Sequence, residues 1–111
     1  VHSHAFQRAM AGLTERTGGK ADDNFWSWRE VMYQFLSSFT PEDVERTASE
    51  LYVELLKSGY TSVGEFHYLH NDISGKHYAN PAEMSERIVN AAKATGMHVT
   101  LLPVMYETAD F

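Results

Sequence analysis

Two histidines, His2 and His4, stand two positions apart at the start of the chain. On an extended strand the side chains at i and i+2 leave on the same face, so two imidazoles can be offered to one cation. Neutral imidazoles bind zinc at about 2.0–2.1 Å. An H-x-H pair alone is a weak signal, because two histidines this close also arise by chance. The pair therefore predicts a metal site only together with its sequence context.

Composition limits the classes of function. The chain has 111 residues, with 43% hydrophobic and 13% aromatic residues, which is enough for a packed core. A net charge of −6 without a Lys/Arg cluster argues against a nucleic-acid partner. There is no cysteine, so any metal here must use His and carboxylate. No run of about 18 apolar residues predicts a membrane span, and because the chain starts at Val1, the lack of a signal peptide carries little weight.

The first predicted helix runs from Asn24 to about Phe39, after a polar, glycine-containing loop over residues 11–23. Asp23 or Asn24 can cap its start. Apolar residues recur in it at spacings of three and four, as one buried helical stripe requires. These are Phe25, Trp28, Val31, Met32, Phe35 and Leu36. The pair Trp26 and Trp28 is interpreted as core packing.

Two further helices are predicted from capping signals. Thr40 as N-cap and Pro41 at the first helical position start one helix, which ends near Gly59. Asn80 and Pro81 repeat the pattern, and that helix ends at Gly96. The expected buried positions are Val44, Ala48, Leu51 and Leu55 in the former, and Met84, Ile88, Ala91 and Ala92 in the latter.

Residues 60–67 and 97–104 are predicted strands. Gly64 within the first indicates close packing or a ligand. The second is an almost continuous apolar run, which is typical of a parallel strand buried on both faces. The order strand, helices, strand, helix, strand, with polar residues at the strand ends, predicts an α/β fold that forms the first portion of a (β/α)8 barrel. Residues 1–111 are thus expected to be one incomplete barrel domain, since such barrels need about 250 residues.

The remaining candidates have simpler interpretations. Glu65 and His67 alternate with Val63, so they share a face that in a barrel is the packed interior or the mouth, and a structural or supporting role is favoured over catalysis. His70 and His77 fall in a polar loop and are expected to be solvated. His98 opens a strand and is expected to be structural.

Arg29 and Tyr68 each leave two interpretations open. Spacing alone favours Arg29 as a surface residue or as a partner of Glu30 or Asp23. A tyrosine such as Tyr68 at a strand end can offer its hydroxyl to a ligand, but it also packs well.

Three segments together resemble the formimidoylglutamate deiminases of the amidohydrolase superfamily. These segments are His2-Ser3-His4-Ala5-Phe6-Gln7-Arg8-Ala9-Met10-Ala11-Gly12, Phe25-Trp26-Ser27-Trp28-Arg29-Glu30 and Gly59-Tyr60-Thr61-Ser62-Val63-Gly64-Glu65-Phe66-His67-Tyr68-Leu69-His70. The H-x-H would indicate only the superfamily, whereas the extension F-Q-R-A-M-A-G, the helix F-W-S-W-R-E and the strand G-E-F-H-Y are far more specific. The resemblance runs over the whole chain.

The resemblance implies a cytoplasmic zinc enzyme of histidine degradation that hydrolyses N-formimidoyl-L-glutamate to N-formyl-L-glutamate and ammonia. It implies one zinc per active site, with His2 and His4 as two of its ligands, and a bound water activated by that metal. It also implies that Gln7, Arg29 and Tyr68 surround this small-molecule substrate. Under this interpretation Arg29 grips a substrate carboxylate through two parallel hydrogen bonds. A homodimer is a family expectation for the full-length protein.

The largest departure from the family is what the chain lacks. Family members supply further ligands and an acid/base group from later strands, as an H-x-x-E motif, another histidine and an aspartate. Near the end of this chain only Glu107 and Asp110 could act as a third ligand, so no catalytic residue is assigned here and the chain alone is expected to be an inactive fragment. The alternatives are another amidohydrolase, such as a guanine or cytosine deaminase, or a non-catalytic barrel remnant that binds another protein through its open sheet edges.

Overall fold

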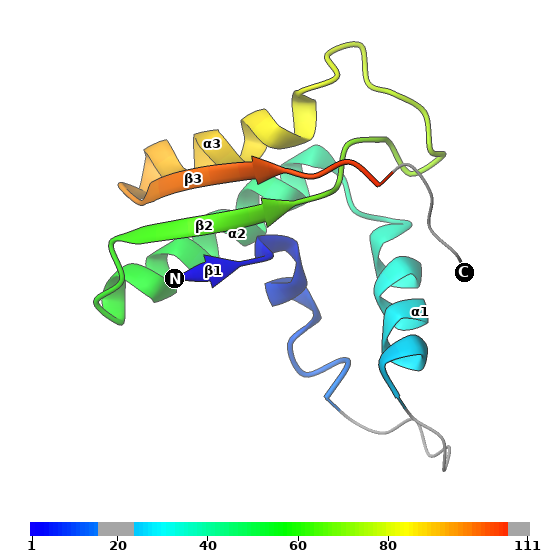
Figure 1. Cartoon of the computed structure of the whole chain (residues 1–111), viewed down its shortest axis with the longest axis horizontal. Coiled ribbons are helices and arrows are strands. Elements are labelled where there is room, and N and C mark those ends of the chain that lie inside the picture. Colours follow the sequence, from blue (N-terminus) through cyan, green and yellow to red (C-terminus); the bar gives the residue numbers. More distant parts are fainter. Residues whose placement is uncertain (16–23, 107–111) are drawn as a thin grey trace.

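The structure is a computed structural model that describes residues 1–15 and 24–106 (Figure 1). Along the chain it contains β1 (His2–Ser3), the 3-10 helix η1 (Ala5–Met10), α1 (Phe25–Leu36), α2 (Pro41–Lys57), β2 (Ser62–His67), α3 (Glu83–Thr95) and β3 (His98–Pro103). This order of strands and helices matches the predicted one. Part of the predicted loop over 11–23, with Asp23 as a helix cap, lies outside the described residues, as do Glu107 and Asp110.

The three strands form one parallel sheet in the order β1-β2-β3. His2 pairs with Gly64 and Ser3 with Glu65, while Ser62 to His67 pair in register with His98 to Pro103. Helices α2 and α3 lie together behind the sheet in Figure 1, and α1 stands beyond the carboxyl ends of the strands. The sheet is thus covered by helices on one face, as in an α/β fold.

The predicted caps of the first two helices are confirmed. The side chain of Asn24 accepts hydrogen bonds from the backbone N–H groups of Trp26 (2.8 Å) and Ser27 (3.4 Å). Thr40 and Asp43 exchange the corresponding bonds at the start of α2, where the Thr40 hydroxyl accepts from the Asp43 N–H at 3.2 Å. Each cap satisfies backbone donors that have no partner within the helix.

The predicted start of the third helix is wrong by two residues. The Asn80 side chain accepts a hydrogen bond from the Ala82 N–H (3.0 Å), and its carbonyl accepts one from Glu83 (3.0 Å). These bonds close a turn, so α3 begins at Glu83 and its N-cap, Ala82, makes no side-chain hydrogen bond. The predicted end is confirmed, because Gly96 is the C-cap with a φ of 82°, a conformation that glycine adopts without strain.

The core lies between the sheet and the two helices behind it. All four positions predicted for α3 are buried, whereas in α2 Val44 and Ala48 are buried and Leu51 and Leu55 are half-buried. Thr47 and Tyr52 of α2, which the stripe omitted, are buried as well.

The predicted stripe of α1 is only partly right. Met32 is buried, and Trp28, Phe35 and Leu36 pack against the core. Phe25 and Val31 are exposed, and Trp26, expected in the core, is 62% exposed. The reason is that α1 packs against the body of the protein with one narrow side near η1.

Within the described residues the last strand is not buried on both faces, contrary to the expectation from its apolar run. In β3 only Val99 and Leu101 are half-buried, and the residues between and after them are exposed. Among the described residues β3 has one strand neighbour, β2, and its helix-facing side packs on α3. No helix among residues 1–15 and 24–106 is long and apolar enough to cross a membrane.

Candidate metal centre and substrate pocket

His2 and His4 meet at the carboxyl end of β1. Their Nε2 atoms are 3.2 Å apart and their rings stand edge to face, with centroids 4.8 Å apart. Two imidazole nitrogens bound to one tetrahedral zinc at 2.0–2.1 Å would be about 3.3 Å from each other. The Nδ1 atom of His4 is buried and has no hydrogen-bond partner among the described residues. The separation of the two Nε2 atoms therefore fits a shared metal ion.

His2 and His4 are two candidate ligands without a third beside them among the described residues. Among residues 1–15 and 24–106 no three His, Cys, Asp or Glu side chains are close enough to hold a metal ion. A zinc site needs at least three protein ligands, so His2 and His4 alone would not complete one.

Aromatic side chains line the space around the histidine pair. The Phe66 ring packs edge-on against both imidazoles, with centroid distances of 6.1 Å to His2 and 5.1 Å to His4. The Tyr68 ring also packs edge-on against that of His4, with centroids 5.9 Å apart.

Gly64, which pairs with His2, places no side chain beside it, and a Cβ there would lie 3.7 Å from the Val1 carbonyl oxygen. That distance is an ordinary contact, so close packing of the backbone does not explain this glycine.

Gln7 and Tyr68, predicted to lie around a substrate, are brought together. The Gln7 amide donates a hydrogen bond to the Tyr68 hydroxyl at 3.1 Å, and both side chains approach the sulfur of Met32, at 3.9 and 3.5 Å. Burial raises the pKa of Tyr68, and the bond from Gln7 opposes this shift. The hydroxyl thus remains a protonated group beside the histidine pair.

Arg29 lies on α1, between two aromatic rings. Its guanidinium carbon is 5.7 Å from the ring centroids of both Trp26 and Tyr33. A guanidinium over aromatic faces is attracted by their electron density, and the rings restrict where it can point. Its positive charge weakly opposes the rise that burial causes in the pKa of Tyr68. Arg29 is not among the residues that line the pocket described next, although its neighbour Tyr33 and the predicted site residue Tyr68 are.

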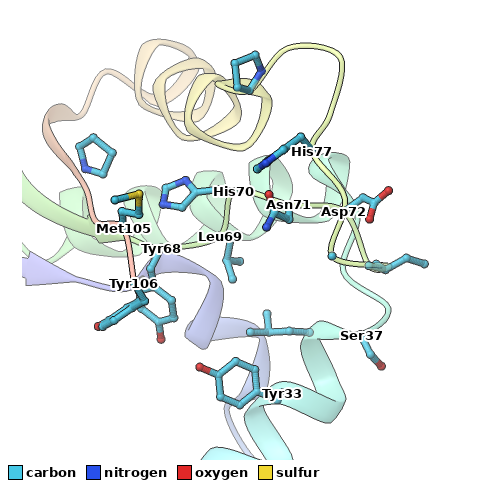
Figure 2. Close-up of a pocket in the computed structure, with 15 residues that line it drawn as sticks. Tyr33, Ser37, Tyr68, Leu69, His70, Asn71, Asp72, His77, Met105 and Tyr106 are labelled. Carbon is cyan, nitrogen blue, oxygen red and sulfur yellow. The ribbon is translucent and has the colours of Figure 1, made fainter. Parts of the chain in front are cut away.

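A pocket of about 850 Å³ opens between the end of α1, the segment after β2 and the end of β3 (Figure 2). Tyr33, Tyr68, His70 and Tyr106 are among the side chains that line it. Tyr68 joins the pocket to the histidine pair, because its ring also packs edge-on against that of His4. Parallel α/β folds bind their ligands at the carboxyl ends of the strands, which is where this pocket lies.

Sequence reasoning missed Tyr33, His70 and Tyr106 as pocket residues. His70 was expected to be solvated, but it is half-buried and its Nε2 lies 2.7 Å from the Val104 carbonyl oxygen. His77 also lines the pocket and is exposed, as expected. Tyr33 stands four residues after Arg29, one turn further along the same helix, and this spacing was an available signal for its place.

Glu65 and His67 share one face of β2, as predicted, but it is neither the barrel interior nor the mouth. Both point to the helix layer and are almost fully buried, with exposures of 0% and 1%. The Glu65 carboxylate accepts hydrogen bonds from Ser3, Ala5 and Tyr52. Burial, with a smaller contribution from His70, lowers the pKa of His67 to about 4.

Two known proteins are similar to this chain over most of its length. The chain is 56% identical over all its residues to formimidoylglutamate deiminase from Pseudomonas aeruginosa, of which it covers 24%. The resemblance to formimidoylglutamate deiminases is confirmed. The crystal structure of an amidohydrolase from Brucella melitensis superposes on 93% of the chain with a TM-score of 0.85 and 58% identity, and the chain covers 23% of that protein. No protein-family model matches the chain. The chain thus spans about a quarter of the length of these amidohydrolase relatives.

Proposed function

We propose that residues 1–111 supply the first portion of a (β/α)8 amidohydrolase barrel and that the whole protein hydrolyses N-formimidoyl-L-glutamate. The observation that carries this proposal is the histidine pair, whose Nε2 atoms lie 3.2 Å apart at the carboxyl end of a parallel strand. The 56% identity to a formimidoylglutamate deiminase supports the choice of substrate. Guanine or cytosine deamination is the alternative within the same superfamily.

In this proposal His2 and His4 hold one zinc ion per active site, together with ligands from elsewhere in the protein. When bound, zinc supplies Lewis acidity that activates water near neutral pH. The water oxygen forms a bond to the formimidoyl carbon, the bond from that carbon to the terminal nitrogen breaks, and the nitrogen leaves as ammonia. The other product is N-formyl-L-glutamate, whose formyl oxygen comes from water.

The residues of this chain bind and orient the substrate. Arg29 grips a glutamate carboxylate with two parallel hydrogen bonds, and the flanking rings of Trp26 and Tyr33 hold the guanidinium in place. Gln7 and Tyr68, already hydrogen-bonded to each other beside His4, present an amide and a hydroxyl to the polar atoms of the substrate. The proton-transferring residue belongs to another part of the protein. The resemblance alone supports a cytoplasmic homodimer.

The test uses the polypeptide encoded by the complete reading frame that contains these residues. We expect later strands of that frame to carry H-x-x-E, a further histidine and an aspartate. The purified protein should release ammonia from N-formimidoyl-L-glutamate and lose this activity when a chelator removes its metal. Ammonia from guanine or cytosine instead would select the alternative deaminase.

The 111 residues expressed alone provide a second test. With two ligands they should bind zinc weakly and release no ammonia from the same substrate. Turnover by this chain alone would contradict the proposal that its metal site is completed elsewhere. A stop codon directly after Phe111 would favour a non-catalytic remnant. A chain that elutes as a monomer in size-exclusion chromatography and unfolds cooperatively on heating would then support an independent small domain.

A further inference from the structure

Glu65 is a fully buried carboxylate with three hydrogen-bond donors. It accepts from the Ser3 hydroxyl, from the Ala5 backbone N–H at 2.6 Å and from the Tyr52 hydroxyl at 3.3 Å. Both of its oxygens are used as acceptors, and all three donors are neutral groups. Burying a carboxylate without such partners costs free energy, so these three donors are what stabilise Glu65 in its buried position.

Two of the three donors flank His4. Ser3 precedes His4 and Ala5 follows it, so the carboxylate holds the backbone on both sides of this histidine. Ala5 is also the first residue of η1, and His4, at the N-cap, makes no side-chain hydrogen bond that could satisfy the free N–H groups there. Glu65 satisfies the Ala5 N–H instead, from a different strand.

The carboxylate cannot itself reach the metal centre. Ser3 and Glu65 are paired residues of neighbouring strands, so their side chains leave the same face of the sheet, toward Tyr52 of α2. His2 pairs with Gly64 and leaves the opposite face, where the imidazoles pack on Phe66. The role of Glu65 is therefore exerted through the backbone of β1 and the start of η1.

We infer that Glu65 is a positioning residue of the metal centre, which fixes the chain from Ser3 to Ala5 and so holds the imidazoles of His2 and His4 in a geometry that one metal ion can bind. The inference rests on the proposed function, since it assigns that geometry to metal binding. The bonds from Ser3 and Ala5 to Glu65 restrain the backbone on both sides of His4.

The test is Glu65→Gln in the full-length protein. Glutamine keeps the shape but turns one oxygen into an N–H donor, which faces other donors and leaves at least one of them unsatisfied. Zinc affinity, measured by competition with a chromophoric chelator, should fall about 10–100-fold, as for other groups that orient metal ligands. The visible spectrum of the Co²⁺-loaded protein should change in the same variant.

Tyr52→Phe is the matched control. It removes the one donor that lies on α2 and leaves the bonds to Ser3 and Ala5 in place. This variant should be destabilised but should keep its zinc affinity and its Co²⁺ spectrum. Ser3→Ala, which removes one bond next to His4 at a half-buried site, serves if Glu65→Gln does not fold, and it should weaken zinc binding with little effect on the melting temperature.

Imidazole NMR spectra of the metal-free proteins measure the geometry without zinc. The His2 and His4 signals should be sharp in the wild type and in Tyr52→Phe, and broadened or doubled in Glu65→Gln. Unchanged spectra and unchanged zinc affinity in Glu65→Gln would overturn the inference, as would losses of zinc affinity that simply follow stability across all variants. A wild-type protein that binds no zinc would refute the proposed function, and the imidazole spectra would still decide the role of Glu65.

Discussion

Acid should destabilise this protein through His67, whose imidazole is buried on the helix-facing side of β2. Its side chain is 1% exposed, and its Nε2 has no hydrogen-bond partner among the described residues. Burial lowers its pKa from 6.5 to about 4, and the nearby ring of His70, with its centroid at 5.6 Å, adds to this shift. The folded protein therefore holds His67 in its neutral form.

The sign and size of the effect follow from linkage. A histidine whose pKa is lower in the folded than in the unfolded protein makes its full contribution to stability above about pH 6.5, and that contribution is lost as the pH falls towards 4. At about 1.36 kcal/mol per pKa unit, the shift from 6.5 to about 4 amounts to about 3.4 kcal/mol at the acid limit. About 2 kcal/mol of this should already be lost at pH 5.

The assay is urea unfolding of the full-length protein and of His67→Asn at several pH values between 7 and 5. The variant cannot titrate at this site, so its free energy of unfolding should fall less than that of the wild type over this range. His77→Asn is the control, because it removes an exposed histidine and should leave the wild-type slope unchanged. Parallel losses in the wild type and His67→Asn would show that His67 does not carry the acid sensitivity.

Two further predictions concern the substrate and the core. Arg29→Ala in the full-length protein should raise KM for N-formimidoyl-L-glutamate about 10–100-fold, since a charged hydrogen-bonded contact contributes about 1.5–3 kcal/mol. Steady-state kinetics that left KM unchanged would refute the role of Arg29 as a carboxylate clamp. Ile88→Ala on α3, at a site 1% exposed, should lower the free energy of unfolding by about 2–5 kcal/mol. Val89→Ala, at the half-buried position next to it, should lower it by less than about 1 kcal/mol in the same denaturation experiment.

Local signals predicted the helices well because their energies are local. Asn24 and Thr40 cap the helices that they were expected to cap, since each bonds to backbone groups only two or three residues away. The same reasoning failed at Asn80, whose side chain and carbonyl both close a turn instead of starting the helix. An Asn-Pro pair favours either outcome, and the sequence does not state which one the neighbouring elements select.

The sequence could not predict which face of the sheet the strand side chains occupy. The alternation along β2 placed Glu65 and His67 together, but strand periodicity does not distinguish the helix-facing side from the inner side of a sheet. Pairing decides it, because Ser3 lies opposite Glu65 and Tyr52 of α2 closes over the carboxylate. Likewise the apolar run of β3 predicted burial on both faces, a property that depends on neighbouring elements that the run itself does not specify.

The pairing of β1 with β2 places the imidazoles and their support on opposite faces of one sheet. A slip of one residue would turn His2 and His4 toward the helices and Ser3 toward the open face. The Val1 carbonyl, which accepts the Gly64 N–H at 2.8 Å, supports the observed register. Because the Glu65 carboxylate binds Ser3 and Ala5 in only one register, it also selects the face on which the imidazoles can meet a metal ion.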